Sequence, residues 1–296
     1  MQTRTSESMK FQRFIALKTP ISVVVFAAAA LVVGTAANAQ LTPPPIVLLG
    51  EVHDNESQHT LRVAVFKELL ETGLRPALLM EQFDREDQRK IDHAIAASAD
   101  LPAAIGATQI IATVVDAKGA GGSWNWAFYR PFLILALEHK LPIIAANVSR
   151  KDTRLIYSQG LSANGFNALV AQDIQATQTQ VIHDSHCGMI NLEQAGKMAA
   201  SQVARDQWMA KQIEAHSRRG VVLLAGNGHV RKDVGVSRWL PEHIAQRTQS
   251  IGYLERDTAA SDRDFANDLM QFDVVRYTAT QQRDDPCAKF QKVPSK

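Results

Sequence analysis

The chain has 296 residues, of which 46% are hydrophobic and 21% charged, so it can bury the core of one large domain. Its formal net charge is only +2, and it contains no basic run, which excludes nucleic-acid binding of the usual electrostatic kind. Its two cysteines form no C-x-x-C or C-x-x-C-H pattern, so neither a zinc pair nor covalently attached haem is expected.

Residues 1–39 are predicted to be an export signal. A basic start is followed by the apolar stretch Ile21–Val33, which is shorter than the roughly 18 residues that a membrane span needs. Ala37-Asn38-Ala39 then provides a cleavage site of the A-x-A type. We therefore expect a periplasmic or secreted protein, with an uncleaved membrane anchor as the alternative. A lipid anchor is not expected, because no cysteine lies near the cleavage site.

Residues 40–280 are predicted to form one α/β domain, followed by a polar tail at 281–296. Apolar runs typical of buried strands alternate with segments of helical periodicity, which favours a mostly parallel sheet with helices on both faces. The helical stretches 84–140 and 152–216 are long for simple crossovers, so an additional helical cap is expected. Residues 110–115 fit either a helix or a strand, and 118–123 read as a glycine-rich loop. The predicted strands are 46–49, 77–80, 143–146, 221–225, 250–254 and 273–277, and the clearest helices are 55–72, 84–97 and 194–216.

Two similar motifs follow two of these strands. Gly50-Glu51-Val52-His53 follows the first strand, and Gly226-Asn227-Gly228-His229 follows the fourth. Glu81 and Asn147 occupy the same position after two further strands. Ligands bind at the carboxyl ends of strands in open α/β sheets, so these side chains are predicted to share one site.

Three interpretations of this set remain open. His53 and His229, with Glu81 or Glu51, could hold a divalent metal that keeps one coordination position open. Alternatively, a histidine and a glutamate could act as a general base and its orienting partner without a metal. The set could also be a structural hydrogen-bond network, with ligand binding elsewhere.

A cluster of aromatic residues spans Trp124 to Phe132 and contains Tyr129 and Arg130. Core packing is the ordinary explanation of such a cluster. A flat apolar ligand would need the same residues, because a tyrosinate can bind haem iron and an arginine can bind a carboxylate. Tyr129 is therefore the first candidate for an iron ligand, with the other tyrosines and the motif histidines as alternatives.

The segment Asp184–Gly188 places His186 beside Cys187. Such a pair can bind soft metals or act as a nucleophile, although adjacent side chains seldom face each other, which favours a loop with a buried cysteine. Cys187 and Cys287 could form a disulfide in an oxidising compartment, but two unrelated thiols is the favoured interpretation. Arg205-Asp206, on a predicted helix, resembles a solvated surface when taken alone.

Taken together, these motifs make the chain similar to the ChaN-like proteins, exported haem-binding uptake proteins grouped with Tiki, TraB and erythromycin esterase-like enzymes. The matching segments occur in the family order across residues 46–240. They are residues 48–55, 79–83, 126–132, 145–148, 186–188, 202–210 and 225–231.

The resemblance implies an α/β fold, noncovalent haem binding and a role in haem or iron uptake. It also implies a homodimer and outer-membrane or periplasmic uptake components as candidate partners. The predicted haem-binding residues are Tyr129, Arg130, Trp126, His186 and Arg205. The wider superfamily contains metal-dependent proteases and esterases with paired G-x-x-H motifs, so the alternative function is a hydrolase that uses Glu51, His53, Glu81 and His229.

Overall fold

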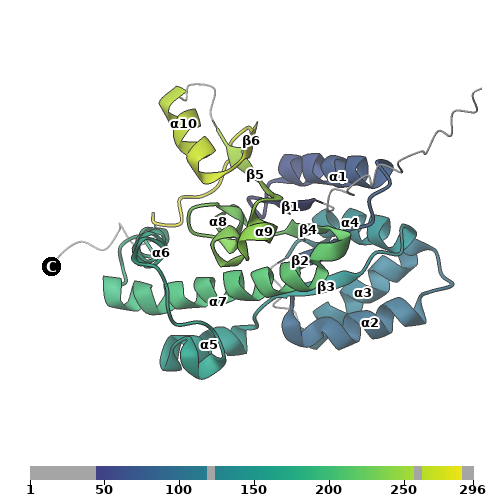
Figure 1. The fold of residues 1–296 in the computed structure, drawn as a ribbon, viewed down its shortest axis with the longest axis horizontal. Coiled ribbons are helices and arrows are strands. Elements are labelled where there is room, and N and C mark those ends of the chain that lie inside the picture. The colour runs from purple at the N-terminus through teal and green to yellow at the C-terminus, as the bar shows by residue number, and fades with distance from the viewer. Residues whose placement is uncertain (1–44, 119–123, 257–261, 289–296) are drawn as a thin grey trace, which may run out of the picture. The chain divides into compact units, whose positions relative to one another are not determined.

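The computed structural model describes residues 45–118, 124–256 and 262–288 (Figure 1). The predicted export signal and most of the glycine-rich loop lie outside these residues. The strands are β1 (Ile46–Leu49), β2 (Ala77–Asp84), β3 (Ile143–Asn147), β4 (Val221–Leu224), β5 (Thr248–Glu255) and β6 (Val274–Thr278). The helices are α1 (Glu56–Glu71), α2 (Gln88–Ala97), α3 (Ala103–Lys118), α4 (Trp126–Glu138), α5 (Arg150–Gln159), α6 (Gln172–Ser185), α7 (Leu192–His216), α8 (Asn227–Val230), α9 (Glu242–Ala245) and α10 (Asp262–Gln271).

In the described part of the chain, six strands form one sheet in the order β3-β2-β4-β1-β5-β6, and every pairing is parallel. The predicted α/β class and the predicted parallel sheet are therefore confirmed. The central strands are continuous apolar runs because both faces of the sheet are covered by helices.

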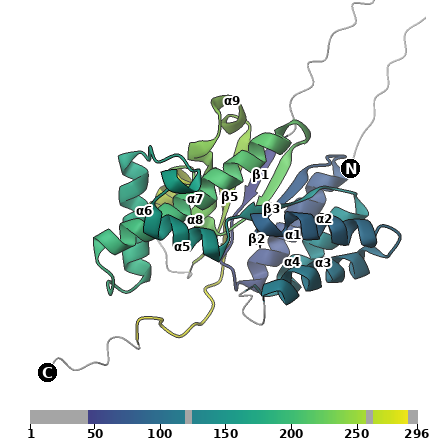
Figure 2. The ribbon, with the colours of Figure 1, turned by 90° about the horizontal axis from the view of Figure 1, so that it is seen from below.

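Each face of the sheet packs against its own set of helices (Figure 2). On one face, Val47 and Leu49 of β1 join a core with α1, α2, α3 and α4. On the other face, Ile46 and Leu48 join a core with α7 and the short helices near β4. The alternation along β1 follows the two-residue period of a strand. Residues 110–115 belong to α3, whose buried Ile110 and Val114 face this first core one helical turn apart.

Helix α1 begins where the sequence predicts, because the Asn55 side chain accepts a hydrogen bond from the Gln58 backbone N–H. Its buried face includes polar side chains, while one of its leucines is exposed. Leu61 is 42% exposed, whereas His59 and Arg62 are buried above Phe66. Polar side chains of α1 therefore face the carboxyl edge of the sheet, where they contact Glu51 and the His53 backbone.

The predicted helical cap is formed by α5, α6 and α7. Helix α7 packs on the sheet through Met209 and Ile213, while its other side carries α5 and α6 in two small apolar clusters. A capping box between Asn191 and Gln194 begins α7. Helices α5 and α6 thus stand outside the layer that covers the sheet.

The cysteines correct one interpretation made from the sequence. Cys187 and Cys287 are not unrelated thiols but form a disulfide, with their Cα atoms 5.6 Å apart. The tail that follows β6 runs back to the turn between α6 and α7, a proximity that the spacing of the two residues does not reveal. Closing a loop of this length, with a sequence separation of 100, is worth on the order of 4 to 5 kcal/mol in the chain-entropy account.

No helix within the described ranges has both the length and the apolar character that crossing a bilayer requires.

Gly50 is predicted to be essential for the packing of β1. A Cβ at this position would meet the Asn227 side chain and, at 2.8 Å, the Val230 side chain. Gly50→Ala should therefore lower the free energy of unfolding by about 1–3 kcal/mol through overpacking. Gly228→Ala is the matched control, since no described atom lies within 4 Å of its Cβ position. Urea unfolding measures both, and equal stabilities of the two variants would contradict this account.

Candidate functional site

The strand register brings the predicted site residues to one edge. Leu49 of β1 and Met80 of β2 both pair with Leu224 of β4. Residues just beyond these three positions therefore emerge side by side at the carboxyl ends of the strands. These are Glu51 and His53 after β1, Glu81 within β2, and Gly226 to His229 after β4.

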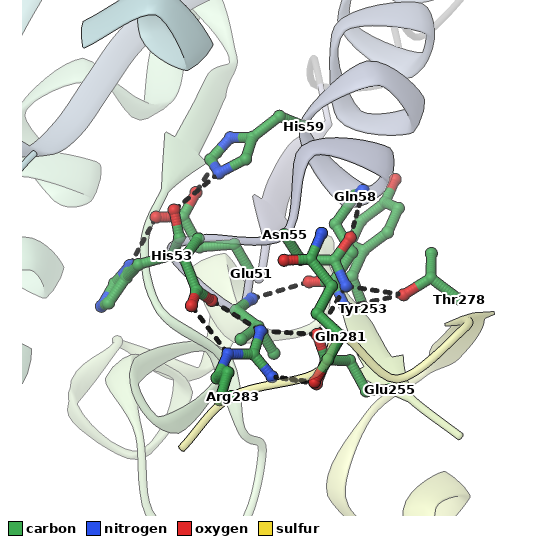
Figure 3. Close-up of polar contacts among 12 residues, drawn as sticks. Glu51, His53, Asn55, Gln58, His59, Tyr253, Glu255, Thr278, Gln281 and Arg283 are labelled. Atoms are coloured by element: carbon green, nitrogen blue, oxygen red, sulfur yellow. Dashed lines mark hydrogen bonds and ion pairs between the residues drawn. The ribbon is translucent and has the colours of Figure 1, made fainter. Parts of the chain in front are cut away.

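The buried Glu51 carboxylate is the centre of the first half of this site (Figure 3). Its Oε1 accepts hydrogen bonds from the Tyr129 hydroxyl at 2.6 Å and from the His53 Nδ1 at 2.6 Å. Its Oε2 pairs with the Arg62 guanidinium. His59 packs nearby, with Nδ1 3.7 Å from Glu51 Oε2 and Nε2 3.0 Å from the His53 carbonyl oxygen.

Arg62 and Glu51 form a fully buried ion pair. The guanidinium also donates to the Leu49 carbonyl oxygen at 3.1 Å and lies over the Phe132 ring. Burial lowers the pKa of Arg62 to about 10, which leaves the guanidinium charged at neutral pH. Removing one partner of such a pair typically costs about 3–5 kcal/mol, because the other charge stays buried without compensation.

His53 is held in one orientation while its ring stays accessible. Its side chain is 50% exposed and meets Trp124 edge to face at 4.7 Å. Since Nδ1 faces Glu51, the other ring nitrogen, Nε2, is directed away from the carboxylate and toward Gly226. Partial burial lowers the pKa of His53, so its ring is neutral at neutral pH.

His229 forms the second half of the site with two carboxylates. Its Nδ1 lies 2.6 Å from Oδ1 of the fully buried Asp206, and its Nε2 lies 3.6 Å from Glu81 Oε1. Burial opposes a charge on His229, but Asp206 and Glu81 outweigh it and raise its pKa. Glu81 also accepts the Gly226 N–H at 2.8 Å. Although burial alone would raise its pKa, His229, His53 and this N–H together lower it.

The result is two histidine–carboxylate pairs, His53–Glu51 and His229–Asp206, that flank Glu81. Gly226 separates them without filling the space, since a Cβ there would lie 3.0 Å from the His53 ring. The two rings have opposite pKa shifts, so one is suited to accept a proton and the other to donate one.

The predicted metal set His53, Glu81 and His229 comes together at this edge. Even so, within residues 45–118, 124–256 and 262–288 no three histidine, cysteine or carboxylate side chains have a geometry that would hold a metal ion.

The predicted haem-binding residues lie in different places. Tyr129 is buried and donates to Glu51, and burial raises its pKa, so it serves here as a neutral hydrogen-bond donor. Trp126 stacks on Phe83 at 5.3 Å. Arg130 points to the Ala104 carbonyl oxygen of α3. His186 ends α6 with its Nδ1 2.8 Å from the Ile182 carbonyl oxygen.

Arg205 lies in a second feature, a groove of about 440 Å³ between α5, α6 and α7. We call this the cap groove. Arg154 and Tyr157 of α5 line it, as do Ile182 of α6 and Met198 of α7. The Arg205 Nε is buried and has no hydrogen-bond partner among the described residues. The cap groove thus combines apolar walls, two guanidinium groups and a phenol.

The sequence analysis missed Arg62 and His59, and it included Tyr157 only as one of the alternative tyrosines. His59 lies three positions before Arg62, and Arg62 lies four positions before Phe66, all on the buried side of α1. This spacing could have identified them, because polar residues on the same helix face as a buried aromatic are themselves buried and need polar partners. No pattern in the sequence distinguishes Tyr157 from the other tyrosines.

Comparisons with known proteins add a family and a fold. A sequence profile described as "Haem-binding uptake, Tiki superfamily, ChaN" matches residues 37–240. A solved structure described as cofacial heme binding to ChaN of Campylobacter jejuni matches with a TM-score of 0.60 and 22% identity, over 78% of this chain and 86% of that chain. The type III effector HopBA1 matches with a TM-score of 0.41 and 12% identity, over 80% and 88%. A search of curated proteins finds no match.

The two site histidines are expected to make stability depend on pH in opposite directions. The folded-state pKa of His229 lies above 6.5, so its contribution is complete below pH 6.5 and is lost as the pH rises through the folded value. The folded-state pKa of His53 lies below 6.5. Its contribution to stability is therefore complete above pH 6.5 and is lost as the pH falls from 6.5 through the folded value.

Urea unfolding from about pH 5 to about pH 9 measures both effects. His229→Gln should flatten the alkaline loss and His53→Gln the acidic loss. The same pH profile in both variants and in the unaltered protein would refute these assignments.

Proposed function

We propose a haem-binding function from one premise: the chain belongs to the ChaN family of haem-binding uptake proteins, in the Tiki superfamily. The family predicted from the motifs is thereby confirmed. Our proposal is that the protein is exported, binds haem without a covalent bond and serves haem or iron uptake.

The cap groove is the proposed haem-binding site. Its volume of about 440 Å³ is in the range typical of small-molecule sites, roughly 300–1,000 Å³. Ile182 and Met198 would contact the apolar porphyrin. Arg154 and Arg205 both line the groove, and their guanidinium groups would pair with the propionates.

The observation that carries the proposal is the exposure of one tyrosine. Of the four tyrosines, Tyr129 and Tyr253 are fully buried, and the Tyr277 hydroxyl donates to Asp268. Tyr157 is 40% exposed and lines the cap groove. Tyr157 is therefore our candidate for the iron ligand, in place of the buried Tyr129.

Export and assembly complete the proposal. The predicted signal at 1–39 supports export, and the disulfide is of the kind that persists in oxidising compartments. A homodimer is the proposed assembly, since the Campylobacter jejuni ChaN structure is described as binding heme cofacially. Stacked haems in this chain would need a second subunit to face the first groove.

Titration with hemin tests the proposal. The unaltered protein should give a saturable Soret shift, and Tyr157→Phe should weaken binding on the order of a hundredfold, about 2.7 kcal/mol, because the iron loses its ligand. Tyr277→Phe is the matched control, as this tyrosine lies on β6 away from the cap groove. The proposal fails if the unaltered protein shows no saturable shift. If Tyr157→Phe binds hemin unchanged while Tyr129→Phe or His53→Ala loses hemin binding, the iron-binding site is at the sheet edge instead.

A second candidate function is favoured by the two histidine–carboxylate pairs. We propose that they could support hydrolysis of an ester or amide by acid–base chemistry. The neutral His53, oriented by Glu51, would take a proton from water, and the protonated His229, held by Asp206, would give one to the leaving group. Glu81 lies beside His229 and stabilises its charge.

Turnover of p-nitrophenyl esters tests this candidate. If the pairs are catalytic, His229→Ala and His53→Ala should each lower kcat by about a hundredfold or more. His243→Ala is the matched control, since this histidine lies on the short helix α9. Chelator treatment separates metal-dependent from metal-free turnover. Equal rates of ester hydrolysis in the unaltered protein and the three variants would exclude a hydrolase that uses these residues.

A further inference from the structure

The chain beyond β6 turns back across the carboxyl edge of the sheet. We call residues 281–288 the strap. In the strap, Arg283 donates to both carboxylate oxygens of Asp54 at 2.7 and 2.6 Å, and to both oxygens of Glu255 at 2.6 and 2.7 Å (Figure 3). Asp54 follows His53 directly, and Glu255 ends β5. Arg283 therefore joins the strap to the ends of two strands at the edge that carries the histidines.

The sheet side of this contact is itself built of paired polar groups. Glu255 accepts a hydrogen bond from the Asn55 side chain at 2.6 Å, and Asn55 caps α1. Hydrogen bonding by Arg283 lowers the pKa of both Asp54 and Glu255, so both carboxylates stay charged at neutral pH. Arg283 of the strap therefore binds two carboxylates whose positions are themselves set by α1 and β5.

Four residues beyond Arg283, the disulfide ties the strap to the cap. Cys187 lies in the turn between α6 and α7, in a left-handed conformation with φ of 57°, and Gly188 continues that turn with φ of 68°. Both cysteines are half-buried, next to exposed residues, so a small reductant can reach the bond. The strap therefore connects the sheet edge to the cap by ion pairs at one end and a covalent bond at the other.

The apolar cluster at the cap end of this connection is small. Near the α6–α7 turn, the described apolar cluster has three buried members, Ile182, Ala195 and Ala199. Ile182 also lines the cap groove, and Met198, which lines it from α7, packs against the same cluster. Segments with few buried apolar contacts open locally at low free energy. This groove wall is therefore formed by the end of α6 that leads into the disulfide-bonded turn.

We propose that the Cys187–Cys287 disulfide is a redox latch that sets the shape of the cap groove and, through it, the retention of haem. This inference rests on the proposed haem function. The reductant is a dithiol. One of its thiolates attacks a sulfur of the disulfide to form a mixed disulfide, and its second thiol then displaces the remaining protein cysteine. The protein disulfide gains two electrons and two protons to become two thiols, and the dithiol becomes a cyclic disulfide.

The oxidised latch holds the Ile182 wall in place and so preorganises the cap groove for its ligand. Reduction frees the strap and the α6–α7 turn, and haem must then order this wall as it binds. Export to an oxidising compartment would keep the latch closed, and a dithiol oxidoreductase would open it.

Hydrogen exchange on the ligand-free, full-length protein tests the latch independently of haem. Dithiothreitol should raise exchange across α6 and the strap and leave β1 and β4 unchanged. Arg283→Gln keeps the disulfide but removes the ion pairs that hold the strap to the sheet edge, so it should raise exchange in the strap and, to a smaller extent than reduction, in α6. Arg276→Gln, at an exposed position on β6, is the matched control and should change neither. Unchanged exchange in α6 on reduction would overturn the latch.

Haem release to apomyoglobin tests the coupling. Thiols bind haem iron, so the comparison uses the Cys187→Ser/Cys287→Ser double variant with no reductant present. Release should be on the order of tenfold faster than from the oxidised protein, because preorganisation is lost. Equal release rates would overturn the coupling even if exchange in α6 rises. Absence of hemin binding by the oxidised protein would instead refute the haem function, with the exchange result still deciding the latch. If the double variant does not fold, release from the protein after reduction and alkylation of both thiols gives the same comparison.

Discussion

The buried charge of Glu51 is the constraint on which the carboxyl edge of the sheet depends. A carboxylate inside the protein is stable only if its partners stay in place, and here they come from three elements: Arg62 from α1, Tyr129 from α4 and His53 from the loop after β1. These contacts bring α1 and α4 to fixed positions on one face of the sheet. They also leave the Nε2 of His53 facing the space that His229 shares. A network that holds the fold together therefore also orients the half-exposed His53 side chain.

Helix α7 connects the two candidate sites. Arg205 and Asp206 are neighbours in sequence but point in different directions, since successive residues of a helix are about 100° apart. Arg205 lines the cap groove, while Asp206 is buried against His229. The proposed haem seat and the histidine pairs are thus separate features on one rigid element. The charge of Arg205 also acts on Glu81, Asp206 and His229, so α7 couples the two candidate sites electrostatically.

Much of the fold could be predicted from the sequence, because its strands are continuous apolar runs and parallel strands place their ends at one edge. This is why Glu51, His53, Glu81 and His229 could be grouped from the sequence alone. The buried face of α1 could not be predicted in this way, because the groups that Arg62 and His59 contact lie outside the helix. The disulfide was missed for a similar reason: its two cysteines meet through the path of the strap, which no local pattern encodes. Tyr157 required knowledge of which tyrosines are buried.

We propose above that haem occupies the cap groove with its iron bound to Tyr157. A crystal structure of the full-length protein with hemin tests this most directly, because it locates the iron atom without reference to any variant. We expect the iron to be bound to the Tyr157 oxygen, with the propionates beside Arg154 and Arg205. Iron beside His53 and Trp124 at the sheet edge, with no haem in the cap groove, would contradict it.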